Sequence, residues 1–338
     1  MSFTWTREKK SMAVAITTSK IKDLSDKILY LNEDTYERKA EDSKKVKPVT
    51  KDDISEVLYS RVANRTIVVN DIYEAFKKGI EYKSDNERAM RAYEEIKRKQ
   101  KRELNEYKIE LPMGSEFEFL PLMKQDLKNG NLRQSLFISG APNSGKSYFC
   151  KNYLLLYNEM YPKNKVFFIS QQDLQKDESL ADVKKFMTQI SIDELMDSEN
   201  PITWESFTES PCLVMIDDYD GLERKAEKRG MKSQFEVVLN LAHNILANAR
   251  KFGTSCIITS HELNSKDGST SKLIKNVDYF IVFTRGILKH NLEYFCLKYL
   301  GLSKDIIEEM RKSPSRWYAI RRLSPFFVLS QYDARILE

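Results

Sequence analysis

One short stretch constrains this chain more than any other. It runs from Ser135 to Phe149 and reads SLFISGAPNSGKSYF. A short apolar run leads into the pattern G-x-x-x-x-G-K-S, whose four fixed positions are Gly140, Gly145, Lys146 and Ser147. A glycine-rich turn between a strand and a helix would be the ordinary interpretation. Because both flanking elements are expected here, as the pattern requires, the stretch instead predicts a phosphate-binding loop.

The residue types in this loop suit the binding of a nucleotide triphosphate. Glycines let successive backbone N–H groups turn inward around a phosphate, and the following helix offers its positive N-terminus to the same anion. Lys146 is expected to reach the β- and γ-phosphates and Ser147 to ligate Mg²⁺. We therefore expect ATP and Mg²⁺ as cofactors. The residues expected around the phosphates are Gly140, Ala141, Pro142, Asn143, Ser144, Gly145, Lys146, Ser147 and Tyr148.

A second stretch, Cys212–Asp220, reads CLVMIDDYD and resembles a Walker B strand. An apolar run followed by Asp is common by itself, but its place downstream of a phosphate loop makes it specific. The acids would emerge at the C-terminal edge of a parallel sheet, where α/β proteins bind ligands. Asp217 is expected to hold Mg²⁺ directly or through water, and Asp218 to polarise the attacking water. Asp220 fits a turn or a supporting residue better.

A third apolar strand, Ser255–His261, follows a long amphipathic helix and has a polar end. A polar side chain there can sense the γ-phosphate, and His261 or Ser260 is the candidate. A plain turn at the end of the strand is the alternative. His243, on the preceding helix, is interpreted as structural rather than as a metal ligand.

Composition limits the remaining choices. The 338 residues suffice for one large domain with additions or for two ordinary ones, and they are 41% hydrophobic and 31% charged. The net charge of +5 permits a nucleic-acid partner without requiring one. The apolar runs are far below the ~20 residues of a membrane span, and the N-terminus lacks the apolar core of a signal peptide. The cysteines are scattered, which favours reduced core residues of an intracellular protein: Cys150, Cys212, Cys256 and Cys296.

Residues 1–111 differ from the rest of the chain. They are rich in Lys, Glu and Asp, and we predict a mainly helical region there, with helical spacing in Ile21–Leu31 and Ile67–Ile80. Asp85–Tyr107 predicts one highly charged helix. Its basic run, Lys97–Arg102, is interpreted as a solvated face, or alternatively as a contact with nucleic-acid phosphates or an acidic partner.

Strands and helices alternate through residues 112–286. This alternation predicts an α/β core with a central, mostly parallel sheet of the RecA-like (ASCE) P-loop type. Residues 287–338 are predicted to form a C-terminal extension or lid packed on that core. Basic and aromatic residues in this extension can contact a nucleic-acid strand, but a surface lid or a subunit interface fits equally well: Arg311, Lys312, Arg316, Trp317, Tyr318, Arg321 and Arg322.

Together these motifs resemble a family. The phosphate loop, Cys212–Asp218, the tract Asn248–Gly253 (NARKFG) and the strand into Thr259-Ser-His261 are similar to the FtsK–HerA superfamily of DNA-pumping ATPases. The double Asp, Leu273–Phe283 and the later Ser-Arg-Trp-Tyr resemble its viral branch, the genome-packaging ATPases of poxviruses, giant DNA viruses and smaller relatives. The resemblance covers roughly residues 112–335. It departs at His261, where the family usually has Gln.

The resemblance implies an oligomeric ring, a pentamer or hexamer, that hydrolyses ATP to translocate double-stranded DNA into a preformed capsid. Its further partners would be capsid, portal or membrane-vertex proteins. It would work in the host cytoplasm or a viral factory, with virion association as a further option. An arginine from the neighbouring subunit completes such sites. Arg250 is the first candidate because it lies in the family tract, ahead of Arg285 and Arg224. A helix-terminal Arg facing the macrodipole explains Arg250 equally well.

Two other functions remain open from the residues. A helicase or AAA+-type remodelling ATPase would share the same motifs and act on nucleic acid or protein. A P-loop kinase or nucleotide switch would also bind the nucleotide, without translocation. The second acid, Asp218, argues against the latter class because water activation requires it.

Overall fold

The computed structural model describes most of the chain. The described residues are 2–7, 11–32, 49–58, 64–78, 80–105, 108–122, 133–197, 199–225, 232–265, 268–323 and 326–337. By its contacts the chain divides into two compact units. The smaller consists mainly of Asp34–Tyr107, and the larger of Ser2–Glu33 with Lys108–Arg335.

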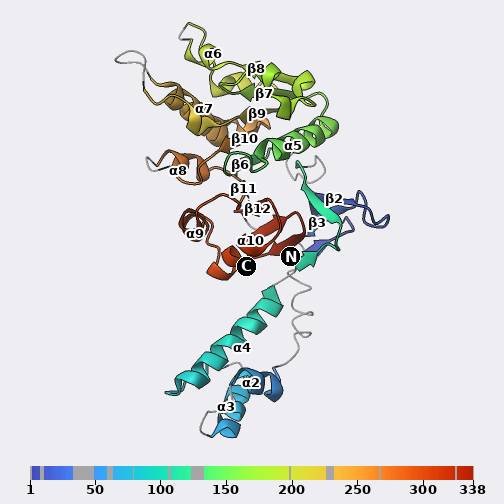
Figure 1. Cartoon of the computed structure of the whole chain (residues 1–338), viewed down its shortest axis with the longest axis vertical. Helices are drawn as coiled ribbons and strands as arrows, with labels where there is room; N and C mark the ends of the chain where they lie inside the picture. The colour runs from blue at the N-terminus through green and yellow to red at the C-terminus, as the bar shows by residue number, and fades with distance from the viewer. Residues whose placement is uncertain are drawn as a thin grey trace. The chain divides into compact units, whose positions relative to one another are not determined.

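A large sheet is the framework of the larger unit (Figure 1). Ten strands pair in it among the described residues. In spatial order they are β4 (Lys108–Glu110), β14 (Asp333–Ile336), β13 (Phe327–Ser330), β12 (Tyr318–Arg321), β11 (Tyr279–Val282), β6 (Ser135–Ser139), β10 (Ser255–Ser260), β9 (Cys212–Ile216), β7 (Lys165–Ile169) and β8 (Met187–Ile190).

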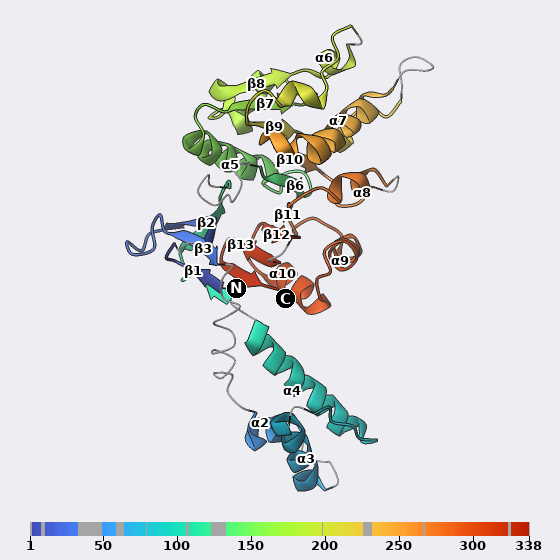
Figure 2. The ribbon, with the colours of Figure 1, turned by 180° about the vertical axis from the view of Figure 1, so that it is seen from behind.

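The half of this sheet from β8 to β11 is parallel, whereas β12 and β13 continue it antiparallel. Strand β10 separates β6, which carries the phosphate loop, from β9, which carries the acidic pair. The helices α5 (Lys146–Met160) and α7 (Gln234–Asn248) flank these strands on opposite sides in both views (Figures 1 and 2). Covered on both faces, β6, β9, β10 and β11 are buried at every position. The predicted α/β fold with a mostly parallel, RecA-like sheet is confirmed.

Shorter elements connect the strands of the larger unit. The remaining α-helices are α6 (Ile192–Met196), α8 (Ser269–Ile274), α9 (Lys289–Lys298) and α10 (Lys304–Lys312). The 3₁₀ helices are η3 (Leu174–Lys176), η4 (Glu178–Leu180), η5 (Lys184–Phe186), η6 (Trp204–Phe207), η7 (Tyr219–Gly221) and η8 (Ala249–Phe252). Residues 287–338 add strands to the central sheet, and their separation from 112–286 as an extension stays a prediction.

A second sheet of the larger unit corrects the prediction for the N-terminal residues. Its order is β1 (Ser2–Thr4), β3 (Ile28–Asn32), β2 (Ser11–Ser19) and β5 (Ser115–Phe119). The predicted helix over Ile21–Leu31 is wrong, because this segment is a turn followed by β3. Leu29 and Leu31 are buried, which is the alternation of a strand, and β2 and β1 pair with β3 on its two edges.

The smaller unit is helical, as predicted. Its helices are α2 (Lys51–Val57), α3 (Arg65–Lys78) and α4 (Glu87–Asn105). They share a core that includes Ile54, Ile72 and Tyr93. The predicted helices are confirmed over residues 67–78 and over Glu87–Asn105, whereas Ile80 and Asp85 are not helical and residues 79, 106 and 107 lie outside the described residues. The basic run lies on α4, but past Lys97 its side chains are outside the described residues.

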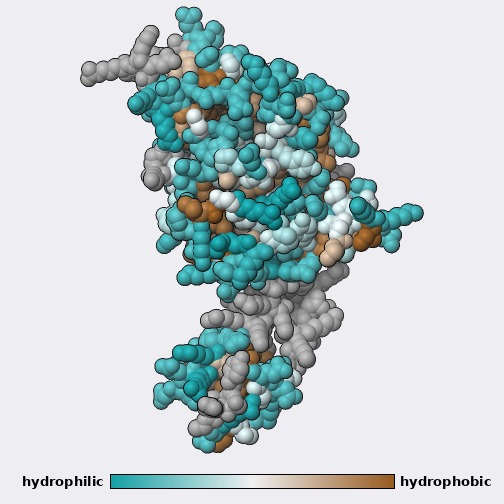
Figure 3. Space-filling view, viewed as in Figure 1, coloured by the Kyte–Doolittle hydropathy of each residue, from teal (hydrophilic) through white to brown (hydrophobic). Residues whose placement is uncertain are grey.

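Burial in the larger unit follows the sequence pattern. Polar side chains dominate the face seen in Figure 3, and apolar residues gather inside. All the cysteines are free and buried, as predicted. Burial raises the pKa of the Cys212 thiol to about 11 and of Cys256 and Cys296 to about 12, so these thiols are unreactive. Within the described ranges, the helices lack the length and apolarity needed to cross a bilayer.

Phe280, at the centre of this core, provides a test of the packing. It lies on β11 and is 0% exposed. The centre of its ring lies 6.3 Å from the ring centre of Phe137 and 5.5 Å from that of Phe295. Because Phe280→Ala leaves a cavity, it should lower the free energy of unfolding by about 3–5 kcal/mol in denaturant titrations. Met113→Ala, at a fully exposed side chain, should change it by less than about 0.5 kcal/mol. Equal effects would contradict the assigned core.

Candidate functional site

The phosphate loop begins directly at the end of β6. Gly140 is packed so closely that an added Cβ would lie 2.6 Å from both Phe283 Cβ and Ser144 Oγ. Gly145, at φ +107°, has the left-handed backbone that starts α5 at Lys146. Both glycine positions of the motif are thus required by the backbone and its surroundings, and the predicted strand–loop–helix is confirmed.

Lys146 is buried beneath the loop, with 8% of its surface exposed. Its Nζ donates to the Gly140 carbonyl at 2.9 Å and lies 3.0 Å from His261 Nδ1. Burial lowers the pKa of this amine, and the carboxylates of Asp218 and Asp217 oppose that effect. The Lys146 amine therefore contacts Gly140 and His261, and a bound phosphate would replace these contacts.

The acidic pair follows β9 at the same edge of the sheet. Thr259, near the end of the adjacent strand β10, joins the two carboxylates: its Oγ1 lies 2.7 Å from Asp217 Oδ1 and 3.3 Å from Asp218 Oδ1. The same oxygen accepts the Asp218 N–H at 2.7 Å. Asp218 has a left-handed backbone, φ +44°, which turns the chain sharply after the strand. Burial, together with Asp218, raises the pKa of Asp217 to about 6.

His261 connects the lysine to the acidic pair. Its Nε2 lies 3.0 Å from Asp218 Oδ2, while Nδ1 faces the Lys146 amine. A protonated lysine can only donate, so Nδ1 acts as the acceptor and the hydrogen lies on Nε2, facing the carboxylate. The structure thus brings together three residues predicted separately: Lys146, Asp218 and His261.

Asp220 fixes the position of His261. Its Oδ2 accepts from Ser260 Oγ and the His261 N–H, both at 2.9 Å, and from the Glu262 N–H at 3.1 Å. Its role as a supporting residue agrees with the sequence. Because the Ser260 hydroxyl already donates to Asp220, His261 is the better placed of the two sensor candidates.

The outer face of the loop is open. Pro142, Asn143 and Ser147 are exposed, and Tyr148 is 62% exposed, whereas Ala141 and Ser144 are half-buried. The Ser144 Oγ is buried without a hydrogen-bond partner among the described residues. Exposed residues around an inner lysine leave room for a phosphate chain to bind along the loop.

Ser147 and Asp217 could hold Mg²⁺ together with phosphate and water, as in other P-loop proteins. Clusters of three or more His, Cys, Asp and Glu able to hold a metal are absent from the described residues. Mg²⁺ typically needs one or two protein oxygens besides phosphate and water. Asp217 is a half-buried carboxylate that accepts a hydrogen bond from the Thr259 hydroxyl, and Ser147 is exposed on the loop. These two oxygens fit the expected ligand set.

The structure also places the candidate arginines. Arg250 lies in η8, but its side chain is outside the described part of the chain. Arg285 donates to the Pro314 carbonyl at 2.8 Å, and the Arg224 guanidinium lies 4.1 Å from the centre of the Phe235 ring. Neither of these two contacts is with the phosphate loop or the acidic pair.

Sequence reasoning missed Thr259, although the residue ends a predicted strand. A hydroxyl at the end of a strand next to the acidic strand is the signal that could have identified it. Only the parallel pairing of β10 with β9 reveals that it contacts both acids.

Comparisons with known proteins find similar chains at low sequence identity. No protein-family model matches the chain. Uncharacterized protein V3 of Sputnik virophage is 28% identical over 209 residues, which are 62% of this chain and 79% of V3. B204, the genome packaging NTPase of Sulfolobus turreted icosahedral virus 2, solved with ATP-gammaS, is 16% identical with a TM-score of 0.40, over 59% of this chain and 96% of B204. The conjugation coupling protein TcpA of pCW3 is 10% identical with a TM-score of 0.41, over 59% of this chain and 60% of TcpA.

Gly140 allows a direct test of the loop. Since a Cβ at Gly140 would overlap Phe283 and Ser144, Gly140→Ala should lower the free energy of unfolding by about 1–3 kcal/mol. Gly221→Ala is the matched control, because nothing lies within 4 Å of a Cβ there. Thermal or denaturant unfolding would measure both. A Gly140→Ala protein as stable as the Gly221→Ala protein would show that the loop is not packed in this way.

Proposed function

We propose that the chain is a Mg²⁺-dependent ATPase. One observation carries the proposal: Lys146 of a phosphate loop and the acids Asp217 and Asp218 meet at the C-terminal edge of parallel strands. This combination supplies a phosphate-binding cation, a metal ligand and a base beside one another. A kinase or switch would not require the second acid.

Each residue has a distinct role in this proposal. Lys146 exchanges its contacts with Gly140 and His261 for the β- and γ-phosphates. Ser147 and Asp217 hold Mg²⁺, which neutralises phosphate charge when bound. Asp218 then orients and deprotonates the attacking water. Because His261 connects Lys146 with Asp218, the arrival of a γ-phosphate at the lysine changes the hydrogen bonding of the base.

We further propose that hydrolysis drives the translocation of double-stranded DNA, with genome packaging into a preformed capsid as the task. The family resemblance of residues 112–335 supports this, and the net charge of +5 permits a polyanionic partner. The chain would act as a pentameric or hexameric ring in the host cytoplasm or a viral factory. Arg250 of the neighbouring subunit is the first candidate to complete each site. Capsid, portal or membrane-vertex proteins would be the further partners.

ATP hydrolysis with and without long duplex DNA tests the proposed task. Duplex DNA should stimulate hydrolysis, and the stimulation should weaken as salt rises from 50 to 200 mM, a range over which phosphate contacts lose strength. Stronger stimulation by single strands would instead favour a helicase. Hydrolysis that responds to no nucleic acid would favour a remodelling ATPase. Phosphate transfer to an acceptor without hydrolysis would overturn the ATPase itself.

Replacing Lys146 should remove turnover without unfolding the chain. Lys146→Ala deletes a buried amine but none of the apolar core, so the chain should stay folded and unfold in one cooperative transition. Its ATP hydrolysis should be at background level. Lys163→Ala, which removes an exposed lysine beyond α5, should hydrolyse ATP at the parent rate. Turnover by Lys146→Ala at the parent rate would contradict the site.

Replacing Asp217 and replacing Asp218 should have different effects on Mg²⁺ binding and on turnover. Asp218→Asn should bind Mg·ATP normally and lose about 10²–10⁴-fold in turnover, as expected for a lost general base. Asp217→Asn should in addition require more Mg²⁺ for half-maximal ATP binding. Titration of Mg²⁺ at fixed ATP separates the two effects. Full activity in both variants would place the catalytic acids elsewhere.

A further inference from the structure

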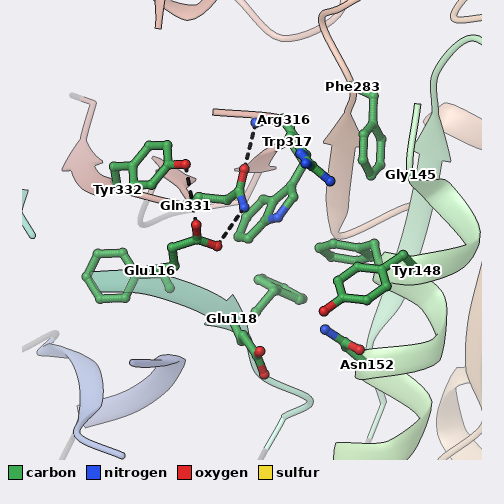
Figure 4. Close-up of a pocket in the computed structure, with 13 residues that line it drawn as sticks. Glu116, Glu118, Gly145, Tyr148, Asn152, Phe283, Arg316, Trp317, Gln331 and Tyr332 are labelled. Atoms are coloured by element: carbon green, nitrogen blue, oxygen red, sulfur yellow. Dashed lines mark hydrogen bonds between the residues drawn. The ribbon is translucent and has the colours of Figure 1, made fainter. Parts of the chain in front are cut away.

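A cavity lies beside the phosphate loop, next to Gly145 and Tyr148. It has a volume of about 270 Å³ and is lined by Gly145, Tyr148 and Asn152 on the loop and α5, by Glu118 on β5, and by Arg316 and Trp317 before β12 (Figure 4). Ligand pockets are typically about 300–1,000 Å³, so this one suits part of a nucleotide. Gly145 belongs to the phosphate loop and Tyr148 directly follows it, so the cavity lies beside the proposed phosphate site.

Flat rings form part of its wall. Tyr148 directly follows Ser147 and is largely exposed, and the Lys151 amine lies over its ring, 5.3 Å from the ring centre. Trp317 is 7% exposed and held in place by Phe149, 5.2 Å away at an interplanar angle of 71°. In Figure 4 the Tyr148 and Asn152 side chains on α5 face Trp317 and Glu118 across the pocket. An aromatic base is the natural occupant of such a space.

The polar groups of the pocket differ in how they are used. Glu116 accepts from Gln331 Nε2 at 2.9 Å and from the Tyr332 hydroxyl at 3.4 Å. Glu118, two residues along β5, pairs with β2 through its backbone, but its carboxylate has no hydrogen bond or ion pair with any described residue. Burial raises the pKa of Glu118, and the neighbouring Glu116 adds to the effect. A half-buried carboxylate without a protein donor has acceptor capacity that a donor group of a ligand can use.

We propose that this pocket binds the adenine base and that Glu118 accepts a hydrogen bond from its 6-amino group. The inference rests on the proposed ATPase function, which supplies the phosphates on the adjoining loop. A carboxylate can only accept, so it favours an amino group at this position. A 6-oxo group would set two acceptors against each other and is disfavoured. Glu118 thereby becomes a determinant of base specificity.

Binding of ATP and ITP, which differ at this 6-position, tests the proposal without requiring hydrolysis. Calorimetry measures both affinities and the stoichiometry, and the quenching of tryptophan fluorescence provides a second signal. The parent protein should bind ATP at least about ten-fold more tightly than ITP. In Glu118→Gln the amide can accept from one base or donate to the other, so the preference should shrink to about two-fold or less.

Two further variants make the result specific. Glu159→Gln removes the same charge from an exposed position on α5 and should keep the parent ratio. Tyr148→Ala should weaken both nucleotides alike, by about 5- to 150-fold, since stacking does not distinguish the bases. An ATP/ITP ratio unchanged in Glu118→Gln, with binding still abolished by Lys146→Ala, would overturn the base pocket alone. If the parent protein bound neither nucleotide, both the pocket and the ATPase proposal would fail.

Discussion

The buried amine of Lys146 is the contact on which the arrangement of the site depends. It joins the loop, through the Gly140 carbonyl, to the end of β10, through His261. Parallel pairing makes this possible, because Ser139 of β6 lies opposite Ser260 of β10. The residues that follow, Gly140 and His261, therefore start from the same level of the sheet. The register of two strands thus sets the distance between a lysine and a histidine far apart in the sequence.

The same register assembles the acidic side of the site. Ile258 of β10 lies opposite Ile216 of β9, so Thr259 reaches the two acids that follow Ile216. Three carboxylates, with Asp220 included, then face one buried lysine. Burial and the adjacent Asp218 raise the pKa of Asp217. The site therefore gathers negative charge around half-buried carboxylates, and a divalent cation would relieve it.

Parts of the site whose contacts are local in the sequence could be predicted, and parts that depend on contacts between distant residues could not. The phosphate loop and the acidic pair could be predicted because each is a continuous run whose strand, turn and helix are specified locally. Lys146 and Asp217 could therefore be predicted as site residues, His261 was one of two sensor candidates, and the hydrogen bonds of Asp220 fit the supporting role expected for it. Thr259 was not predicted, because its contacts are with Asp217 and Asp218, about forty residues away. The role proposed for Glu118 depends on a pocket whose other walls come from distant segments, such as Trp317.

The N-terminal strands show the opposite limit. The apolar residues of Ile21–Leu31 happen to recur at helical spacing, but β1 and β2 pair with β3 and make Leu29 and Leu31 alternate as in a strand. Pairing of β2 with β5, almost a hundred residues later, completes that sheet. Local periodicity contains no information about such a partner. Tertiary contacts decided the structure there.

A structure of the chain with Mg²⁺ and a non-hydrolysable ATP analogue would test the central assignment most directly. We expect the Lys146 amine to leave the Gly140 carbonyl and His261 for the β- and γ-phosphates, with Mg²⁺ held between Ser147 and Asp217. Asp218 should face the γ-phosphate through a water molecule. An analogue bound elsewhere, or bound beside a Lys146 that keeps its present contacts, would contradict the account.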